Sequence, residues 1–390
     1  MTGNAIVLKC SEQTAWSAHF FIAIARAALT ACGHSPNIIQ LVTCWPSTAP
    51  HLTSHPGIAH LTFIGSRPVA HHVARDAAKS LTPVTVELGG KDAAIVLDDV
   101  KNLKSCASML MRGVFQSAGQ NCVGIERIIA TPAVYPRLVE LLEPRIRALR
   151  QGDPLQHEED VDVGASISDS GFSKLEKLIS EAVEQGARLL VGGKRFVNPQ
   201  APKGHYFAPT LLVDVTSHMS IANEELFGPV CVVMRASSVA DAIAITNSTP
   251  YGLGCSVFGS NTRDLEAVTS GVSVGMVAVN DFAAYYVCGL PFGGVRGSGY
   301  GRFGGAEGLR ALCNTKSVCV DRFPGLIGTA IPPRLDYVAR VQVQVEEVGK
   351  RERKGAKMMA WEFAKGIVEV GYGMALRQRV EGVVKLVKNG

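Results

Sequence analysis

The sequence predicts an α/β protein with two domains. At 390 residues the chain can bury a large core, and it exceeds the length at which a single core usually stops growing. An apolar fraction of 47% with 40 glycines is typical of a globular α/β composition. Short apolar runs also alternate with helical stretches, which is the pattern of a parallel sheet covered by helices.

Charge and cysteine content exclude several classes of protein. Residues 331–390 carry twelve Lys and Arg against seven Asp and Glu, which accounts for the whole net charge of +5 and leaves the rest neutral. A neutral body argues against binding to nucleic acid. The ten cysteines include no Cys-x-x-Cys pair and lie in runs that we expect to be core, and the histidines show no ligand spacing. We therefore expect reduced thiols, a cytoplasmic location and no metal. No signal peptide is recognisable at the start.

The first part of the chain alternates strands and helices. We expect a buried strand at residues 4–9, a helix at 11–29, strands at 38–42, 58–64 and 84–87, and a helix from about Pro68. In such a doubly wound arrangement, the ends of the strands present groups to a nucleotide.

The second part begins after the glycine pair Gly89-Gly90. The expected elements are a strand at 93–97, helices at 102–115, 138–149 and 171–185, a hairpin ending near Leu211, and a strand at Thr315–Asp321. The stretches 335–348 and 358–387 are basic and amphipathic. They are compatible with a membrane surface, a partner, or a helix docked on the protein itself.

One short stretch carries the chemistry, Gln116-Ser117-Ala118-Gly119-Gln120-Asn121-Cys122. A thiol that attacks a carbonyl needs space and unpaired backbone N–H groups, and a turn with Gly119 offers both. The carboxylate of Glu87 could then activate water to release a thioester. Taken alone, a Cys is more often a small buried hydrophobe and a Glu a solvated helix residue.

Several motifs together resemble the aldehyde dehydrogenase superfamily. They are Glu87-Leu-Gly-Gly-Lys91, Gly119-Gln-Asn-Cys122, Glu224-Glu-Leu-Phe-Gly-Pro229, and Pro291-Phe-Gly-Gly294 with Gly297-Ser-Gly-Tyr-Gly-Arg302. The resemblance covers about residues 3–322. It implies that residues 1–88 form a partial Rossmann-type dinucleotide-binding domain and residues 89–302 an α/β catalytic domain. Residues 303–330 would then form a return segment with an oligomerisation strand, and residues 331–390 an atypical, basic and amphipathic helical tail.

The resemblance assigns catalysis to Cys122 as nucleophile and Glu87 as base. The cofactor positions that it implies are Lys9, Glu12, Gly65, Ser66, Leu88, Glu225 and Phe227. Glu225 would bind the nicotinamide ribose and Phe227 would pack on the ring. Because a carboxylate at the adenosine ribose repels a 2′-phosphate, Glu12 favours NAD over NADP. Phe282, Tyr285 and Tyr286 occur where the family lines a substrate tunnel, although an aromatic cluster could equally be packing.

The sequence also departs from the family pattern. It begins in the middle of that pattern, so we expect an N-terminally truncated chain without the Asn that supplies the second oxyanion donor. A tryptophan and two prolines at 43–50 replace the usual small residues.

The implied function is oxidation of an aldehyde to a carboxylic acid with NAD, through a cysteine thiohemiacetal and thioester, in a homo-oligomer. The alternatives are a catalytically impaired protein with a binding or scaffolding role, and a cofactor-free thiol esterase.

Overall fold

A computed structural model describes residues 2–155, 161–199, 201–320, 322, 362 and 376–389. The chain divides into two compact units, Met1–Thr315 and Lys316–Gly390, and each is described by itself. The first unit holds every predicted catalytic and cofactor residue.

The first unit is built on a seven-stranded sheet. Its strands are β5 (Ala93–Val96), β6 (Arg127–Ala130), β7 (Arg188–Val191), β10 (Thr210–Val215), β11 (Val230–Arg235), β12 (Gly254–Phe258) and β13 (Met276–Val279). They run in the order β13-β12-β5-β6-β11-β10-β7, and all neighbours are parallel except β10 and β7. This arrangement confirms the predicted α/β class. A two-stranded hairpin, β8 (Arg195–Phe196) with β9 (Tyr206–Phe207), extends from it.

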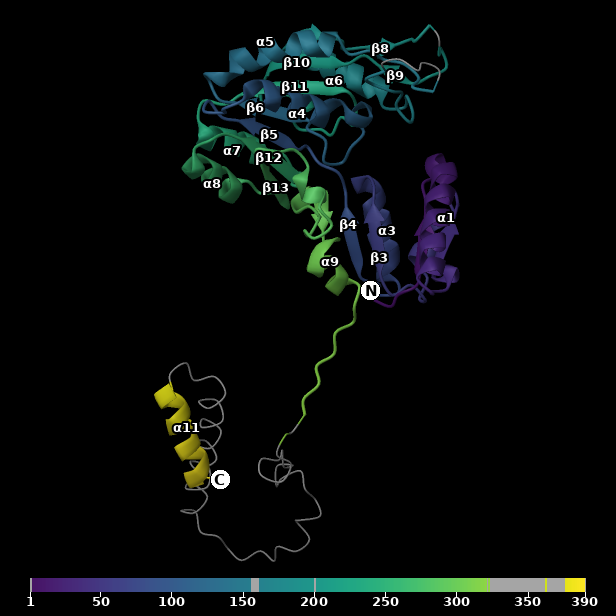
Figure 1. Cartoon of the computed structure of the whole chain (residues 1–390), viewed down its shortest axis with the longest axis vertical. Coiled ribbons are helices and arrows are strands. Elements are labelled where there is room, and N and C mark those ends of the chain that lie inside the picture. The colour runs from purple at the N-terminus through teal and green to yellow at the C-terminus, as the bar shows by residue number, and fades with distance from the viewer. Residues whose placement is uncertain are drawn as a thin grey trace, which may run out of the picture. The chain divides into compact units, whose positions relative to one another are not determined.

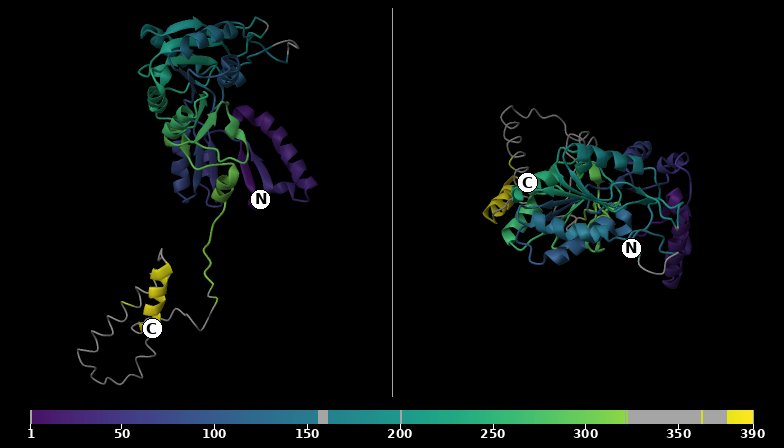
Figure 2. Two further views of the ribbon diagram at one scale, coloured as in Figure 1. Left: turned by 60° about the vertical axis from the view of Figure 1, so that its left-hand side comes forward. Right: turned by 90° about the horizontal axis from the view of Figure 1, so that it is seen from above.

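Helices cover both faces of this sheet (Figures 1 and 2). The helices are α4 (Leu103–Phe115) and α5 (Val134–Arg147) on one face, and α6 (Phe172–Glu184), α7 (Val239–Asn247) and α8 (Thr262–Gly271) on the other. Alternate residues of β5 point into the two cores: Ala93 and Ile95 face one, and Ala94 and Val96 the other. Because both faces are covered, every residue of β5 is apolar and buried.

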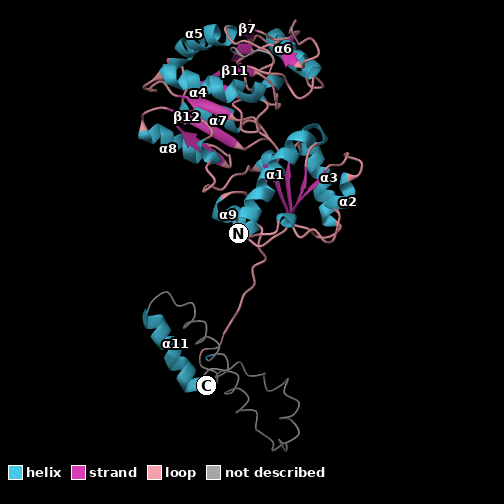
Figure 3. Ribbon diagram, turned by 45° about the vertical axis from the view of Figure 1, so that its right-hand side comes forward, coloured by secondary structure: helices cyan, strands magenta, loops and turns pink. Residues whose placement is uncertain are grey.

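The first 88 residues form smaller sheets. The elements are β1 (Ile6–Lys9), α1 (Ala15–Ala31), β2 (Ile39–Val42), α2 (Ala49–Thr53), β3 (Leu61–Ile64), α3 (Arg67–Ala78) and β4 (Val84–Glu87). Strands β1 and β2 pair in parallel, as do β3 and β4, and Figure 3 shows these short strands beside α1 and α3. The helix α2 was not predicted.

The prediction of a buried first strand is wrong. Ile6, Val7 and Leu8 of β1 are 51%, 45% and 40% exposed. Their apolar character predicted burial, but β1 pairs only with β2 in a two-stranded sheet, and such a sheet cannot cover its own faces.

A late segment returns to the strand that ends in Glu87. Strand β14 (Gly299–Tyr300) runs antiparallel to β4, with Gly299 opposite Glu87, and α9 (Gly305–Ala311) follows. The strand predicted at Thr315–Asp321 is not found over residues 315–320, where no described strand pairs with the chain; Val318 and Val320 are 71% and 73% exposed. Apolar alternation alone cannot make a strand, because a strand needs a hydrogen-bonding partner.

In the second unit the structure describes α11 (Leu376–Asn389). The predicted helical tail is helical there; most of 331–390, including the stretch 335–348, lies outside the described residues. Val380, Val383, Val384 and Val387 form an exposed stripe on α11. Among the described residues, no helix combines the length and hydropathy needed to cross a bilayer.

The expectation that the cysteines lie in the core is only partly right. All ten are free, but Cys32, Cys288, Cys313 and Cys319 are exposed. They lie in turns and in the segment after α9, where neighbouring apolar residues misled the prediction.

We predict that Gly299→Ala destabilises the first unit. Gly299 has φ +114°, and an added Cβ would overlap the carbonyl oxygen of Val86 on β4. The strained backbone should lower the free energy of unfolding by about 1–3 kcal/mol, as measured by urea denaturation. Gly171→Ala is the control, because nothing lies within 4 Å of its added Cβ. Equal stability of the two variants would contradict a close β4–β14 approach.

Candidate active site

The thiol lies just after a tight left-handed turn. Helix α4 ends at Phe115, and Ser117, Ala118 and Gly119 then have φ values of 57°, 56° and 73°. A Cβ on Gly119 would overlap the carbonyl oxygen of Gly228, so only glycine fits there without strain. The turn therefore packs directly against the segment that follows Phe227.

Cys122 is half-buried and lies against Glu87. The two groups are close enough for each to shift the pKa of the other, and Sγ of Cys122 donates to Oδ1 of Asn121 at 4.0 Å. Within the described chain, the backbone N–H of Cys122 has no hydrogen-bond acceptor. Burial, and then the charges of Glu87 and Asp92, raise the pKa of Cys122 to about 12. The thiol is therefore protonated near neutral pH and needs a base to become nucleophilic.

Glu87 is the last residue of β4 and is almost fully buried, at 1% exposure. Its Oε1 accepts a hydrogen bond from the N–H of Gly89 at 3.1 Å. Burial raises the pKa of Glu87, while the bonds from Gly89 and Cys122 oppose that rise. A carboxylate with a raised pKa beside a thiol is suited to accepting its proton.

The predicted ribose carboxylate lies next to this pair. Oε1 of Glu225 accepts the N–H of Gly90 at 3.2 Å, and a Cβ on Gly89 would overlap the same oxygen. Burial, and then the charge of Glu126, raise the pKa of Glu225 to about 7. Phe227 is 46% exposed with φ +50°, so it is not ordinary core.

A buried ion pair that was not predicted lies beneath these groups. Nζ of Lys91 is 2.7 Å from Oε2 of Glu126, with side-chain exposures of 0% and 8%. The Glu126 carboxylate also accepts the N–H of Leu226, at 3.0 and 2.9 Å to its two oxygens, and that of Phe227 at 3.0 Å. The sequence carried a signal for it: Glu126-Arg127 interrupts an apolar run, and charges inside a buried strand require partners.

Arg127 and Asp92 are two further buried ionisable residues of the site. The Arg127 guanidinium donates to the carbonyls of Lys91, Ile245 and Thr246 at 2.8–3.0 Å. Burial raises the pKa of Asp92 well above its ordinary value, and its Oδ2 has no hydrogen-bond partner among the described residues. Asp92 is thus a buried acid with a raised pKa that also influences the thiol of Cys122.

Gly65, Ser66 and Leu88 lie around the ends of β3 and β4. The N–H of Gly65 donates to the carbonyl of Glu87 at 3.1 Å, and that of Leu88 to Ser298 at 3.0 Å. Ser66 is the N-cap of α3, but its hydroxyl does not cap the helix. The hydroxyl and the first N–H groups of α3 therefore remain available to an anion.

Lys9 and Glu12 pair with each other, with Nζ 3.5 Å from Oε2. Lys9 ends β1, and Glu12 begins the short 3₁₀ turn before α1. No described contact joins them to Cys122 or Glu87.

The three aromatic residues have different environments. Phe282 is buried in the core beside α4, which is packing. Tyr285 is buried in a cluster against which Cys122 and Phe292 pack. Tyr286 is 51% exposed; it donates to Oδ1 of Asn121 at 2.9 Å and stacks on Phe292.

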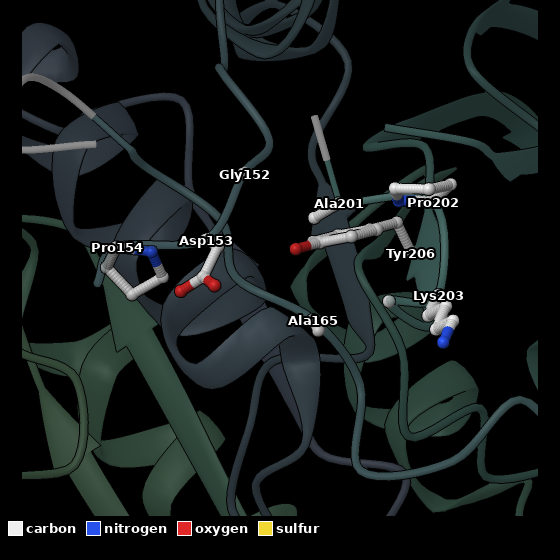
Figure 4. Close-up of a pocket in the computed structure, with 9 residues that line it drawn as sticks. Gly152, Asp153, Pro154, Ala165, Ala201, Pro202, Lys203 and Tyr206 are labelled. Carbon is white, nitrogen blue, oxygen red and sulfur yellow. The ribbon is translucent and has the colours of Figure 1, made fainter. Parts of the chain in front are cut away.

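A cavity of about 590 Å³ lies elsewhere in the first unit (Figure 4). Its lining residues are Gly152, Asp153, Pro154, Ala165, Ala201, Pro202, Lys203, Gly204 and Tyr206. It contains no thiol and none of the predicted site residues, so we place the candidate site at Cys122. Within the described ranges, no group of three or more His, Cys, Asp or Glu side chains could hold a metal ion.

Comparison with known proteins shows the family of the chain. The model of the aldehyde dehydrogenase family matches residues 1–318, so the chain belongs to the aldehyde dehydrogenase family. It is 51% identical to a putative aldehyde dehydrogenase-like protein of Saccharomyces cerevisiae, over 99% of this chain and 59% of the yeast protein. The chain therefore spans less than two thirds of that relative.

Two further proteins are similar over about four fifths of the chain. A succinate-semialdehyde dehydrogenase [NADP(+)] of Mycobacterium leprae is 33% identical over 82% of this chain and 67% of its own length. A betaine aldehyde dehydrogenase of Staphylococcus aureus, solved in complex with NAD+, superposes with a TM-score of 0.72 at 29% identity, covering 79% of this chain and 61% of that one. Both nicotinamide cofactors therefore occur among the similar proteins.

We predict that Glu87→Gln makes the Cys122 thiol more acidic. Because the Glu87 charge helps to raise the pKa of Cys122, its removal should lower that pKa without restoring the ordinary value, since burial remains. At about pH 9 the variant should be alkylated faster by iodoacetamide, with the Cys122 peptide followed by mass spectrometry. Glu140→Gln, on the exposed face of α5, is the control. Unchanged alkylation in Glu87→Gln would show that the two side chains do not interact.

Proposed function

We propose that the chain carries the catalytic site of an aldehyde dehydrogenase, which oxidises an aldehyde to a carboxylic acid with NAD. The observation that carries the proposal is the proximity of the Cys122 thiol and the Glu87 carboxylate, each of which shifts the pKa of the other. It is supported by the unpaired N–H of Cys122 and by the position of Glu225 over Gly89 and Gly90.

The residues of this chain would act in sequence. Glu87 accepts the thiol proton, and the Cys122 sulfur attacks the aldehyde carbon to form a thiohemiacetal. The backbone N–H of Cys122 stabilises the negative oxygen. After oxidation to the thioester, Glu87 returns its first proton to solvent and accepts one from water, which attacks the thioester carbon. The C–S bond then breaks, the acid is released, and the leaving sulfur of Cys122 takes back the proton from Glu87.

The residues fit a nicotinamide dinucleotide. When bound, that cofactor supplies the acceptor for the hydride. Glu225 would accept hydrogen bonds from the nicotinamide ribose, and the half-exposed Phe227 would pack on the ring. Ser66 and the N-terminus of α3, preceded by Gly65, are available to the pyrophosphate, and Leu88 would lie beside the cofactor.

NAD is proposed over NADP because Glu12 would repel a 2′-phosphate. Lys9, at 3.5 Å, weakens this preference, since its charge partly neutralises Glu12.

The Cys122–Glu87 pair also favours a second function, a cofactor-free thiol esterase, because these two groups can open an activated ester without a hydride acceptor.

We further propose that the protein is cytoplasmic and forms a homo-oligomer. The exposed side chains of Val318 and Val320 after α9 are in keeping with a subunit contact. None of the described contacts bears on the predicted membrane-surface contact of the tail.

We predict that Cys122→Ala reduces NADH formation to background with a panel of aldehydes, because no nucleophile remains. Glu87→Gln should slow aldehyde oxidation by about 10²–10⁴-fold, because it removes the acceptor for both the thiol proton and the proton of water. Cys106→Ala, a buried cysteine of α4 away from Glu87, is the control for loss of a thiol. Unchanged oxidation in Cys122→Ala would overturn the assignment; ester cleavage without NADH formation in the unaltered chain would favour the esterase.

We predict that Glu12→Gln raises the use of NADP relative to NAD, because the repulsion of the 2′-phosphate is lost while Lys9 keeps its charge. The ratio of kcat/KM for the two cofactors is the measurement. Gln13→Glu, which adds a charge one residue away, is the control for nonspecific electrostatics. A ratio that does not move would place Glu12 away from the adenosine ribose.

A further inference from the structure

Three sequence segments meet at the carboxylate of Glu126. Lys91 ends the segment that starts with Glu87, and Glu126 itself lies four residues after Cys122. Leu226 and Phe227 belong to the segment that presents Glu225. The salt bridge and the hydrogen bonds to Glu126 measure 2.7–3.0 Å, so one side chain joins all three segments.

These bonds restrain the backbone directly after Glu225. The N–H groups of Leu226 and Phe227 donate to Glu126, and Phe227 has a left-handed backbone conformation. On the other side, the carboxylate of Glu225 contacts Gly89 and Gly90, one residue before Lys91. A shift of residues 226 and 227 would therefore move Glu225 away from the glycines.

We infer that Glu126 is a positioning residue that holds the Glu225–Phe227 segment in the geometry needed to bind the nicotinamide half of the cofactor. This inference rests on the proposed function of Glu225. Lys91 has a supporting role: it compensates the charge of Glu126, which would otherwise be buried without a partner.

The inference requires the hydrogen bonds from Leu226 and Phe227 to the side chain of Glu126. The ion pair with Lys91 is needed only to compensate the charge of Glu126. Glu126→Ala removes both, whereas Glu126→Gln combined with Lys91→Met keeps an acceptor oxygen for Leu226 and Phe227 and leaves no unpaired charge. Glu224→Gln is the matched control. Its carboxylate lies one residue before Glu225 and pairs with the exposed Lys174 at 2.6 Å.

The experiment compares NAD and NADH affinity, by fluorescence titration, with the alkylation rate of Cys122 in each full-length variant. We expect Glu126→Ala to weaken cofactor binding by about 10-fold or more, with the alkylation rate of folded protein changed much less. The double variant should recover most of the affinity, and Glu224→Gln should bind as the unaltered chain does. Circular dichroism checks that each variant is folded. If Glu126→Ala does not fold, the cofactor affinity of the double variant alone tests the inference.

Three results would overturn the inference. They are unchanged affinity in folded Glu126→Ala, equal loss of affinity and alkylation rate, and a folded double variant that binds cofactor about 10-fold more weakly than the unaltered chain. Glu225→Gln separates these from failure of the proposed function. If it binds cofactor normally, the role of Glu225 is wrong; if it binds weakly while the Glu126 variants bind normally, only the present inference fails.

Discussion

The buried carboxylate of Glu126, which pairs with Lys91 and accepts the N–H groups of Leu226 and Phe227, is the group on which the arrangement of the site depends. Two charges with 0% and 8% exposure are tolerable only when paired and hydrogen-bonded, and here the remaining capacity of the carboxylate is taken by two backbone N–H groups. Arg127 extends the same arrangement to the end of α7 through two carbonyl oxygens. The segments that carry Cys122, Glu87 and Glu225 are therefore all joined through Glu126.

This arrangement concentrates acids around a thiol. Glu87, Asp92 and Glu225 all have raised pKa values, chiefly through burial, and the pKa of Cys122 rises with them. Acids in such surroundings exchange protons near neutral pH more readily than solvated ones. The same burial that makes the sulfur a poor nucleophile at rest makes its neighbour a better base.

Most of the fold could be predicted from local pattern. Strands buried on both faces, such as β5, are continuous apolar runs, and α4 begins at the capping residue Asn102. The failures have physical causes. Ile6–Leu8 is apolar but belongs to a two-stranded sheet, and residues 315–320 lack a pairing strand. At the site, motifs indicated Cys122, Glu87 and Glu225, whereas Glu126 was missed because its partners lie 35 and 100 residues away.

The depth of Cys122 also bears on how the protein meets oxidants. Peroxide reacts with accessible sulfur in its anionic form, and the sulfur of Cys122 is half-buried and has a raised pKa, so both properties are reduced. Cys32, Cys288, Cys313 and Cys319 stand at the surface and would encounter the reagent first. We therefore expect mild oxidation to modify these surface thiols before it modifies Cys122.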